Sequence, residues 1–516
     1  MNGAVALLRA AAASGVDVCF ANPGTTEMDL VVALDAVPSI RPVLGLFEGV
    51  CTGAADGFGR MADRPALTLL HLGPGFANGI ANLHNARRAK SPVVNVVGDH
   101  AWWHRPSDAP LTSDIEGLAR PVSRWVRTSG SPAALVADIG EALGAATGPP
   151  GGVATLIVPQ DRAWLEVGAS SGGAMLAAPD ATRPDPDVIR GAAATLRAAG
   201  GAGLLWLGGR ALRERGLAAA ARIAAATGCR ARHDPFPARL QRGAGLPSFD
   251  PLPYFPEQAV EDLAGVTVAV LAGAPAPVAF FGYRDGVSEL LPAGCEVVRI
   301  DPERGWADDA LDALADELDA GPAPVPDAAA PTERPTGELS AGSLGRAVAA
   351  VQPEGAIVVN EAATTSRAWH NQSAGAPSHT ELTLTGGAIG QGLPCAVGAA
   401  IACPERRVIA LEADGSGLYT PQALWTMARE GLEVTVVVCA NRKYRILQHE
   451  LTRMGIERAG LAATALTELE HPHPDWVSLA QGFGVPGVAV DRADDLVREL
   501  DRALAEPGPA LIEAIL

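Results

Sequence analysis

The 516-residue sequence lacks an excess of basic residues: 40 Lys and Arg stand against 58 Asp and Glu, for a formal net charge of −18 at pH 7. This balance argues against a nucleic-acid partner and against an anionic membrane surface. The sequence also lacks an uncharged apolar run long enough to cross a bilayer, and it lacks a charged and apolar leader segment. We therefore expect a soluble, cytoplasmic protein.

Closely paired cysteines are missing as well. Seven cysteines are scattered without a C-x-x-C pair, and most of them stand in apolar runs. They predict small core residues in a reducing compartment.

A G-x-G-x-x-G fingerprint after a strand is also absent, since the nearest candidate, Leu207-Gly-Gly-Arg210, does not have that spacing. This absence argues against a nicotinamide dehydrogenase built on Rossmann domains.

Ala, Gly and apolar residues are abundant, and strand-like and helix-like segments alternate along the chain. The length allows roughly three domains of ~150 residues. The pattern predicts an α/β fold of three consecutive domains with mostly parallel sheets. We expect these domains at residues 1–165, 187–318 and 340–516, joined by Pro- and Gly-spotted linkers at 168–186 and 321–335.

Polar residues end two apolar runs in the last third of the chain. One run ends on Asp414-Gly415-Ser416 and the other ends on Asn441, 441 − 414 = 27 residues later. Buried parallel strands deliver side chains to their C-terminal edge in this way. A crossover helix from Thr420 to Gly431, with Pro421 in its first turn, is predicted between them. We therefore expect Asp414 and Asn441 side by side on neighbouring strands.

These two side chains predict a metal site. A carboxylate, an amide oxygen and a loop carbonyl, here that of Lys443, suit a hard divalent cation such as Mg²⁺. Gly415 lets the backbone approach a phosphate, and the N-terminus of the following helix favours negative charge. An isolated Asp-Gly after a strand is more often a simple turn, but the Asn one crossover later favours the metal site.

Glu48 forms a second candidate site near the N-terminus. It follows the apolar run Val43–Phe47 and heads a helix of small residues, so we expect it to be largely buried. A buried carboxylate without a neighbouring Lys or Arg retains a proton more readily and becomes a proton-sharing group. The alternative is a helix-terminal carboxylate that interacts favourably with the helix dipole.

The spacing of Asp414-Gly415 and Asn441 resembles the Gly-Asp-Gly…Asn motif of thiamine-diphosphate enzymes, with Ala413 in place of the first Gly. With Glu48 present too, the chain resembles the thiamine-diphosphate decarboxylase and acetolactate synthase family over essentially its whole length. The resemblance implies a pyrimidine-binding N-terminal domain, a central domain and a C-terminal domain that binds the diphosphate through Mg²⁺. It also implies active sites between subunits, and therefore a homodimer or a homotetramer.

The resemblance assigns roles to residues of the first domain. Glu48 would bond N1′ of the cofactor's aminopyrimidine and promote loss of the C2 proton. The N-terminal loops are more similar to benzoylformate decarboxylase than to acetolactate synthase. This similarity implies that Thr25 contacts the substrate carboxylate and that His71 transfers protons, with His100 as a further candidate. A lone His after a strand is more often structural, and that alternative remains open for His71.

In the third domain, the segment 385–394 resembles the loop that bends the cofactor. Ile389 would be the apolar fulcrum, and the Gly387 carbonyl would accept a bond from the 4′-amino group. Tyr444 would contact the diphosphate through its backbone. The remaining cofactor and metal residues implied by the resemblance are Asp414, Gly415, Ser416, Asn441 and Lys443.

The central domain departs from the family pattern. Where benzoylformate decarboxylase places its second active-site His, residues 271–283 offer Phe280 or Phe281 and no His. Acetolactate synthases tend to have a Gln that faces FAD after the fourth strand. This chain has Asp99-His100 at that point, so FAD is not expected. Residues 101–104 form an aromatic loop that either shapes a substrate pocket or packs on the surface.

The resemblance implies a thiamine-diphosphate- and Mg²⁺-dependent carboligase or decarboxylase that acts on 2-oxo acids, similar to acetolactate synthase. One alternative is a catalytically silent cofactor-binding subunit, and another is a lyase that cleaves 2-hydroxy ketones. Glu48 argues against the silent subunit, because a scaffold does not need a proton-sharing carboxylate. The sequence leaves open the substrates, the choice between protonation and ligation, and any nucleotide bound by the central domain.

Overall fold

A computed structural model describes residues 1–168, 182–284, 286–302, 305–324, 332–456 and 458–516. Within them the chain forms three sheets flanked by helices, and the pairing in each sheet is mostly parallel. The predicted α/β fold of three units is therefore confirmed. Most of the expected linker at 168–186 and about half of the linker at 321–335 lie outside the described residues. Among the described residues, no helix combines the length and the apolar character that spanning a bilayer requires.

The first sheet, within residues 1–168, has six parallel strands in the order β2-β1-β3-β4-β6-β5. Its strands are β1 Val18–Asn22, β2 Arg41–Leu44, β3 Ala66–His71, β4 Val93–Asp99, β5 Trp125–Thr128 and β6 Val153–Pro159. Its helices are α1 Gly3–Ala13, α2 Met28–Asp35, α3 Glu48–Ala62, α4 Leu72–Ala89, α5 Ile115–Ala119, α6 Leu135–Thr147 and α7 Gln160–Trp164. Apolar residues fill both faces of this sheet, as expected for parallel strands covered by helices.

The second sheet, in the described residues between 182 and 324, has five parallel strands in the order β10-β8-β7-β11-β12. Its strands are β7 Gly203–Leu207, β8 Arg230–His233, β10 Asp250–Pro251, β11 Val268–Ala272 and β12 Glu296–Arg299. Its helices are α8 Pro186–Ala199, α9 Glu214–Thr227, α10 Pro256–Asp262 and α11 Ala307–Glu317.

The third sheet orders its described strands β17-β18-β16-β15-β13-β14-β9, and only β9 is antiparallel to its neighbour. Its strands are β9 Leu240–Arg242, β13 Ile357–Asn360, β14 His379–Thr383, β15 Val408–Ala413, β16 Val434–Ala440, β17 Gly487–Val490 and β18 Ala510–Ile515. Its helices are α12 Ala341–Val351, α13 Ala363–Gln372, α14 Gly392–Ala402, α15 Ala423–Glu430, α16 Arg445–Arg453, α17 Leu461–Ala465, α18 Trp476–Gly482 and α19 Ala493–Ala505. Strand β9 comes from the middle of the chain, so the central segment also completes the third sheet.

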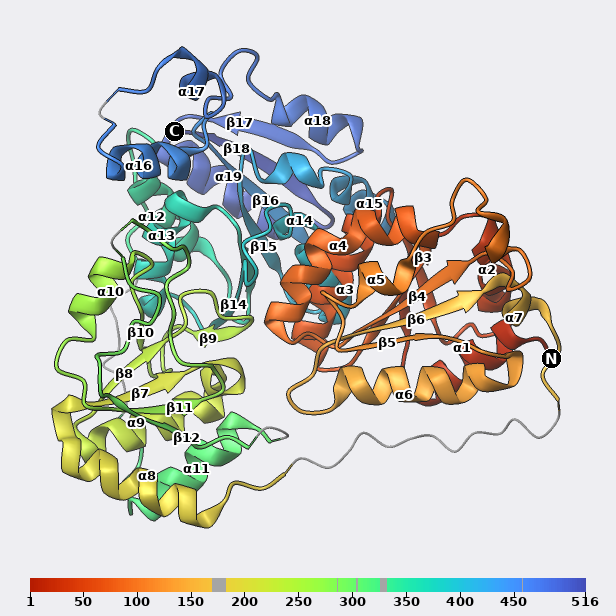
Figure 1. Ribbon diagram of the computed structural model, residues 1–516. Helices are drawn as coiled ribbons and strands as arrows, with labels where there is room; N and C mark the ends of the chain where they lie inside the picture. Colours follow the sequence, from red (N-terminus) through yellow and green to blue (C-terminus); the bar gives the residue numbers. More distant parts are fainter. Residues whose placement is uncertain (169–181, 285, 303–304, 325–331, 457) are drawn as a thin grey trace.

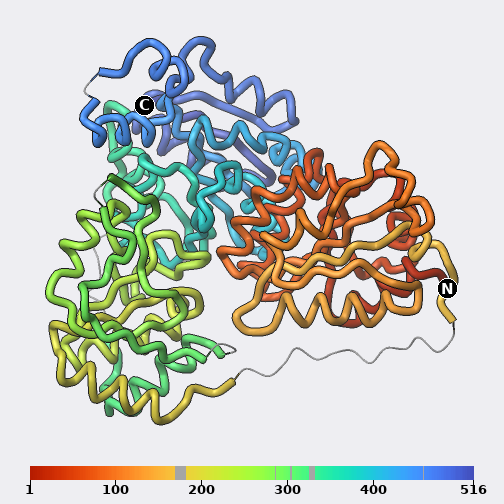
Figure 2. Tube along the Cα trace, in the orientation of Figure 1, coloured from red at the N-terminus to blue at the C-terminus, as the bar shows by residue number. Residues whose placement is uncertain are grey.

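Helices α3 and α14 join the first and third units, which lie side by side in Figures 1 and 2. Small residues allow the contact. A Cβ on Gly57 would lie 2.1 Å from the backbone oxygen of Cys395, and one on Gly398 would lie 1.8 Å from that of Ala54. The small residues that follow Glu48 in the sequence therefore let α3 pack closely against α14. All seven cysteines are free, and five of them are buried, in line with the sequence prediction.

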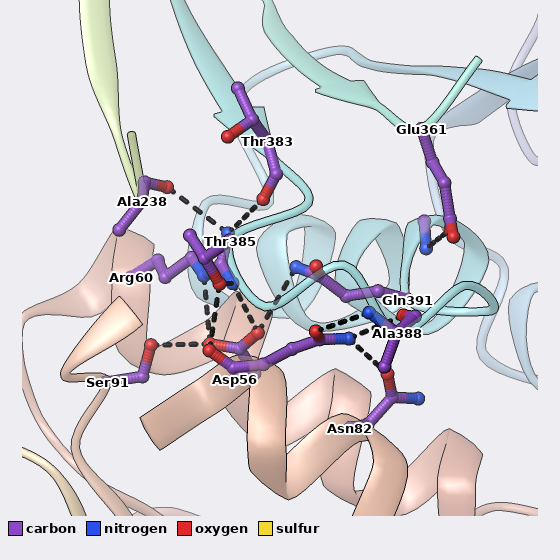
Figure 3. A network of polar contacts seen from close by, with 12 residues as sticks. Asp56, Arg60, Asn82, Ser91, Ala238, Glu361, Thr383, Thr385, Ala388 and Gln391 are labelled. Atoms are coloured by element: carbon purple, nitrogen blue, oxygen red, sulfur yellow. Dashed lines mark hydrogen bonds and ion pairs between the residues drawn. The ribbon is translucent and has the colours of Figure 1, made fainter. Parts of the chain in front are cut away.

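A buried ion pair lies at the same junction (Figure 3). Asp56 accepts bonds from Arg60 Nε at 2.8 Å and Nη2 at 2.6 Å, and both side chains are almost fully buried. Arg60 Nη1 also donates to the carbonyl of Thr383 at the end of β14, 2.7 Å away. The pair therefore joins α3 to the third sheet through atoms that water does not reach.

Replacing Asp56 with Ala should lower the free energy of unfolding by about 3 kcal/mol, because Arg60 would remain buried without its counter-charge. Urea unfolding followed by circular dichroism measures this change. Asp17→Ala is the matched control, since it breaks the solvent-exposed pair with Arg64 and should cost less than about 1 kcal/mol. Equal effects of the two substitutions would contradict this account.

Candidate active site

Asp414 and Asn441 follow two neighbouring strands of the third sheet, as predicted. Strands β15 and β16 pair in parallel, with Ala413 opposite Cys439, so both side chains emerge at the same C-terminal edge. Asp414 is 2% exposed, and its carboxylate accepts bonds from the backbone N–H of Gly415 at 3.0 Å and of Arg442. The Asn441 amide oxygen accepts the Lys443 N–H at 3.1 Å. One loop thus holds both side chains, and burial raises the pKa of Asp414.

The connection between these strands differs from the prediction. Helix α15 begins at Ala423, so Pro421 precedes the helix instead of standing in its first turn. A single 3₁₀ turn over Gly417–Tyr419 takes the place of the expected helix N-terminus beside Gly415. The reason is a tertiary contact: Thr420 has an extended φ of −139° and donates its hydroxyl hydrogen to the Gly390 carbonyl at 2.9 Å. Thr420 is thereby unavailable as a helical residue.

The loop over residues 386–392 lies against helix α4 (Figure 3). Asn82 donates to the Gly390 carbonyl at 3.2 Å, and Asn85 donates to the Ala388 carbonyl at 2.7 Å. Gly387 has a φ of +75°, a conformation that only glycine adopts readily. Ile389 is half-buried. The loop therefore has a fixed backbone and can present the carbonyl and the apolar side chain predicted to contact a cofactor ring.

Two buried carboxyl groups beneath this loop were missed by the sequence analysis. Glu361 follows β13 and accepts the N–H groups of Gly390, at 2.7 Å, and of Gly392. Glu412 lies beside it, because a Cβ on Gly392 would touch the carboxyl oxygens of both. Burial raises the pKa of both groups, and the charge of Glu361 adds to the shift of Glu412. Glu361 could have been found by the rule that identified Asp414, because it also follows an apolar strand.

Glu48 is the first residue of helix α3, as predicted, at the C-terminal edge of the first sheet. Its side chain is half-buried in the single chain, so the expectation of a largely buried carboxylate was wrong. The reason is its place at the helix end, where the carboxylate extends beyond the sheet edge and accepts a bond from Asn78 Nδ2 at 3.0 Å. Gly75 leaves room beside it, since a Cβ there would lie 3.1 Å from Glu48 Oε1.

His71 pairs with a buried acid that sequence analysis also missed. Its Nδ1 lies 2.8 Å from Glu27 Oε2, and Glu27 is fully buried. The Thr26 hydroxyl donates to Glu27 Oε1 at 2.6 Å and lies 3.3 Å from His71 Nδ1, whereas the predicted substrate contact Thr25 is exposed. Gly75 touches both His71 and Glu48, because a Cβ there would lie 3.3 Å from His71 Cβ. Glu27 therefore fixes the imidazole at the sheet edge where Glu48 also lies.

His100 follows β4, the strand next to β3. Its Nε2 is buried without a hydrogen-bond partner in the described part of the chain, and its ring packs edge-on against His104 at 5.3 Å. Asp99 pairs with Arg105 at 2.9 Å. The adjoining aromatic loop is largely on the surface, since Trp103 is 71% exposed. His100 is thus at the same sheet edge as His71, but no contact links the two.

The donor set fits a divalent cation with a diphosphate. Among the described residues, no group of three or more His, Cys, Asp or Glu side chains converges as a metal site, so a cation here depends on amide and carbonyl oxygens besides Asp414. These are the ligands that Mg²⁺ accepts while it also binds phosphates. Together with Glu48, the His71–Glu27 pair and the Gly387 loop, they are the arrangement expected of an enzyme that uses thiamine diphosphate.

The comparisons with known proteins agree with this class. The family described as "Thiamine pyrophosphate enzyme, N-terminal TPP binding domain" matches residues 1–116, and its "C-terminal TPP binding domain" matches residues 362–514. A Mycobacterium tuberculosis protein, provisionally named acetolactate synthase large subunit IlvX, is 50% identical over 100% of this chain and 99% of its own length. The chain belongs to the thiamine pyrophosphate enzyme family.

Decarboxylases are also similar over nearly the full length. Benzoylformate decarboxylase from Pseudomonas aeruginosa is 28% identical and covers 97% of this chain and 96% of its own. The structure of a thiamine diphosphate-dependent 4-hydroxybenzoylformate decarboxylase from Rhodococcus jostii aligns with a TM-score of 0.87 at 26% identity. That alignment covers 100% of this chain and 99% of the other.

Proposed function

We propose that this enzyme decarboxylates a 2-oxo acid with thiamine diphosphate and Mg²⁺, in the cytoplasm, and that the product is an aldehyde or a 2-hydroxy ketone. The observation that carries the proposal is the His71–Glu27 pair at the same sheet edge as Glu48, an arrangement that offers proton-handling groups there. Similarity to acetolactate synthases and to benzoylformate decarboxylases supports both product types. FAD is not part of the proposal.

Each end of the cofactor has its own residues in this proposal. Asp414, Asn441 and the Lys443 carbonyl hold Mg²⁺, while Gly415, Ser416 and the Tyr444 backbone contact the diphosphate. The Gly387 carbonyl and Ile389 orient the aminopyrimidine, and Glu48 shares a proton with it. When bound, thiamine diphosphate supplies the nucleophilic carbon and the electron sink for loss of CO₂.

His71 delivers protons in this proposal. Glu27 accepts the Nδ1 proton, which leaves Nε2 as the nitrogen available to the substrate, and the His71 side chain is 23% exposed. Thr25 and His100 stand at the same edge as candidates for contact with the substrate carboxylate and for a second proton transfer. Glu27 behind the imidazole holds the ring in one orientation, as the acid of a catalytic triad does.

Carboligation is a second candidate function, and the central segment favours it. Phe280 and Phe281 occupy the position where the resemblance places a second His, and neither can donate a proton. Slower protonation would leave time for attack on a second carbonyl compound. Two copies of the chain would form the proposed homodimer or homotetramer, because Leu46 and Trp103 expose apolar surface, 44% and 71% respectively, in the loops that follow β2 and β4 of the first sheet.

A single-turnover assay tests the proposal. The enzyme with thiamine diphosphate and Mg²⁺ is mixed separately with pyruvate, benzoylformate and longer 2-oxo acids, and CO₂ and organic products are followed. CO₂ release supports the proposal, and aldehyde or hydroxy ketone identifies the second half of the reaction. If the cofactor binds and no 2-oxo acid reacts, the proposal is wrong, and cleavage of 2-hydroxy ketones is tested next.

Replacing Glu27 with Gln should lower kcat by roughly 10- to 100-fold, the range known for losing the partner that orients a metal-bound His. The binding of thiamine diphosphate should stay unchanged, because the hydrogen bonds of Glu27 go to Gly24, Thr26 and His71, and none goes to a residue proposed to hold the cofactor. Steady-state kinetics and cofactor titration by fluorescence measure the two effects. Asp29→Asn, two residues further along, is the control. A parallel loss of cofactor affinity would indicate a structural role for Glu27.

A further inference from the structure

Six aromatic rings form one cluster between the second sheet and the third. Neighbouring ring centroids lie 4.9–6.4 Å apart, mostly edge to face, which is the preferred geometry of aromatic pairs. The cluster consists of Phe236, Tyr254, Phe255, Phe280, Phe281 and Tyr283. Burial raises the pKa of Tyr254 to about 12, so its ring stays neutral and the cluster stays apolar.

The cluster touches the loop predicted to hold the cofactor ring. A Cβ on Gly387 would lie 2.8 Å from Phe280 Cζ, so this ring packs directly on the Gly387 backbone. Residue 387 therefore favours glycine for two reasons: its φ is positive, and a side chain there would collide with the Phe280 ring. Phe280 belongs to the segment after β11, at the C-terminal edge of the second sheet.

The other end of the cluster touches helix α16, which follows residues 441–443 of the proposed metal site. Tyr283 donates its hydroxyl hydrogen to Glu450 at 3.0 Å. The Arg453 guanidinium lies over the rings of Tyr283 and Phe255, 4.4 and 4.1 Å from their centroids, as in a cation–π contact. The cluster therefore extends from the loop at the ring end of the cofactor to the helix next to its diphosphate end.

Two rings of the cluster face open space. Phe280 is 42% exposed and Phe281 is 52% exposed, whereas the other four rings are half-buried. Side chains of this size are costly to leave in water, and an exposed aromatic patch beside a catalytic site usually contacts a ligand. The proton-handling groups lie on another unit, so these rings have no part in acid–base chemistry.

We infer that Phe280 and Phe281 form the subsite for the substrate side chain and select 2-oxo acids whose side chain is aromatic. The inference rests on the proposed function, since it places the substrate alongside the cofactor that Gly387 and the metal loop hold. An aryl group stacks edge to face on the two rings and removes them from water. The methyl group of pyruvate is too small to cover them, so binding favours the aryl donor.

The test compares two donors in wild-type enzyme and in the Phe280→Ala, Phe281→Ala variant. With benzoylformate, kcat/KM should fall by roughly 30-fold, within the range for lost apolar contacts in a specificity pocket. With pyruvate, the fall should be about tenfold smaller, because pyruvate leaves the rings uncovered and any effect through the Gly387 loop would reduce both donors alike. Wild-type enzyme should prefer benzoylformate. Val278→Ala is the matched control, because this 65% exposed side chain lies two residues before Phe280 and carries no ring.

Three results would overturn the inference while the proposed function survives. They are a wild-type preference for pyruvate, unchanged selectivity in the double variant, and equal losses for both donors with weaker cofactor binding. Unchanged selectivity would assign the exposed rings to a second copy of the chain, and equal losses would assign them to support of the Gly387 loop. Failure of the wild-type enzyme to release CO₂ from either donor, with cofactor bound, would refute the proposed function itself and the inference with it.

Discussion

Glu48→Gln should lower the single-turnover rate of CO₂ release by about 1,000-fold, within the range that general acid–base groups contribute. The amide keeps the size of the side chain but cannot share a proton with the aminopyrimidine. Asn78, which donates to Glu48 Oε2 at 3.0 Å, can still donate to the oxygen of the Gln amide, so the local structure should persist. Thiamine diphosphate should therefore bind with nearly normal affinity.

Two measurements separate this effect from a structural one. Cofactor titration by intrinsic fluorescence should give similar dissociation constants for wild-type and Glu48→Gln, and the two melting temperatures should agree. Glu166→Gln, which changes an exposed carboxylate of the same unit, should retain full activity. A Glu48→Gln enzyme with more than a tenth of the normal rate would remove Glu48 from the mechanism, and the acid would then be a helix-terminal residue only.

Local sequence signals were sufficient for much of the fold. The apolar runs at Ala66–His71 and Val93–Val97 each predict a buried strand; the first matches β3 to the residue, and the second extends to Asp99 in β4. These strands are continuous apolar runs bounded by polar or turn residues, so burial on both faces is recorded in the sequence itself. Asp414 and Asn441 were found for the same reason, because each directly follows such a run.

Long-range contacts could not be predicted in this way. Strand β9 has only three residues, and it is a strand because it pairs with β14, about 140 residues away in the sequence. Glu27 lies in a polar loop that resembles any turn, and only the fold brings it to His71. The partial exposure of Glu48 likewise depends on where the end of α3 lies relative to the sheet, which no local pattern specifies.

The first and third units use the same structural device. In each, carboxyl or imidazole side chains at or shortly after the ends of buried parallel strands are held by hydrogen bonds from loops: Glu27 and His71 in one unit, Asp414 and Glu361 in the other. Buried carboxyl groups at such edges are costly, as the raised pKa of Asp414 indicates. Burial of these groups lowers the free energy of unfolding of the cofactor-free protein, and binding of a cation and the cofactor would raise it again.

Asp414→Ala should weaken the binding of thiamine diphosphate with Mg²⁺ by about 1,000-fold, or roughly 4 kcal/mol, because Asp414 supplies the charge for the cation. At a cofactor concentration of 1,000 wild-type dissociation constants, binding stabilises the native state by about 4.1 kcal/mol. The variant should gain only about 0.4 kcal/mol under the same conditions. Thermal unfolding with and without cofactor and Mg²⁺ measures the difference.

The apo form of the Asp414→Ala variant should melt close to the wild-type temperature, because removing a buried carboxylate relieves its desolvation while it gives up two backbone hydrogen bonds. Chelation of Mg²⁺ in the wild-type enzyme should reproduce the variant's behaviour, since both remove the link between Asp414 and the diphosphate. Glu405→Ala, in the exposed turn before β15 and thus at the opposite sheet edge, should respond to the cofactor like the wild type. If the Asp414→Ala variant still shows the full Mg²⁺-dependent rise in melting temperature, the cation does not bind at the Asp414–Asn441 edge. If that rise is lost only in this variant and under chelation, the cation binds there.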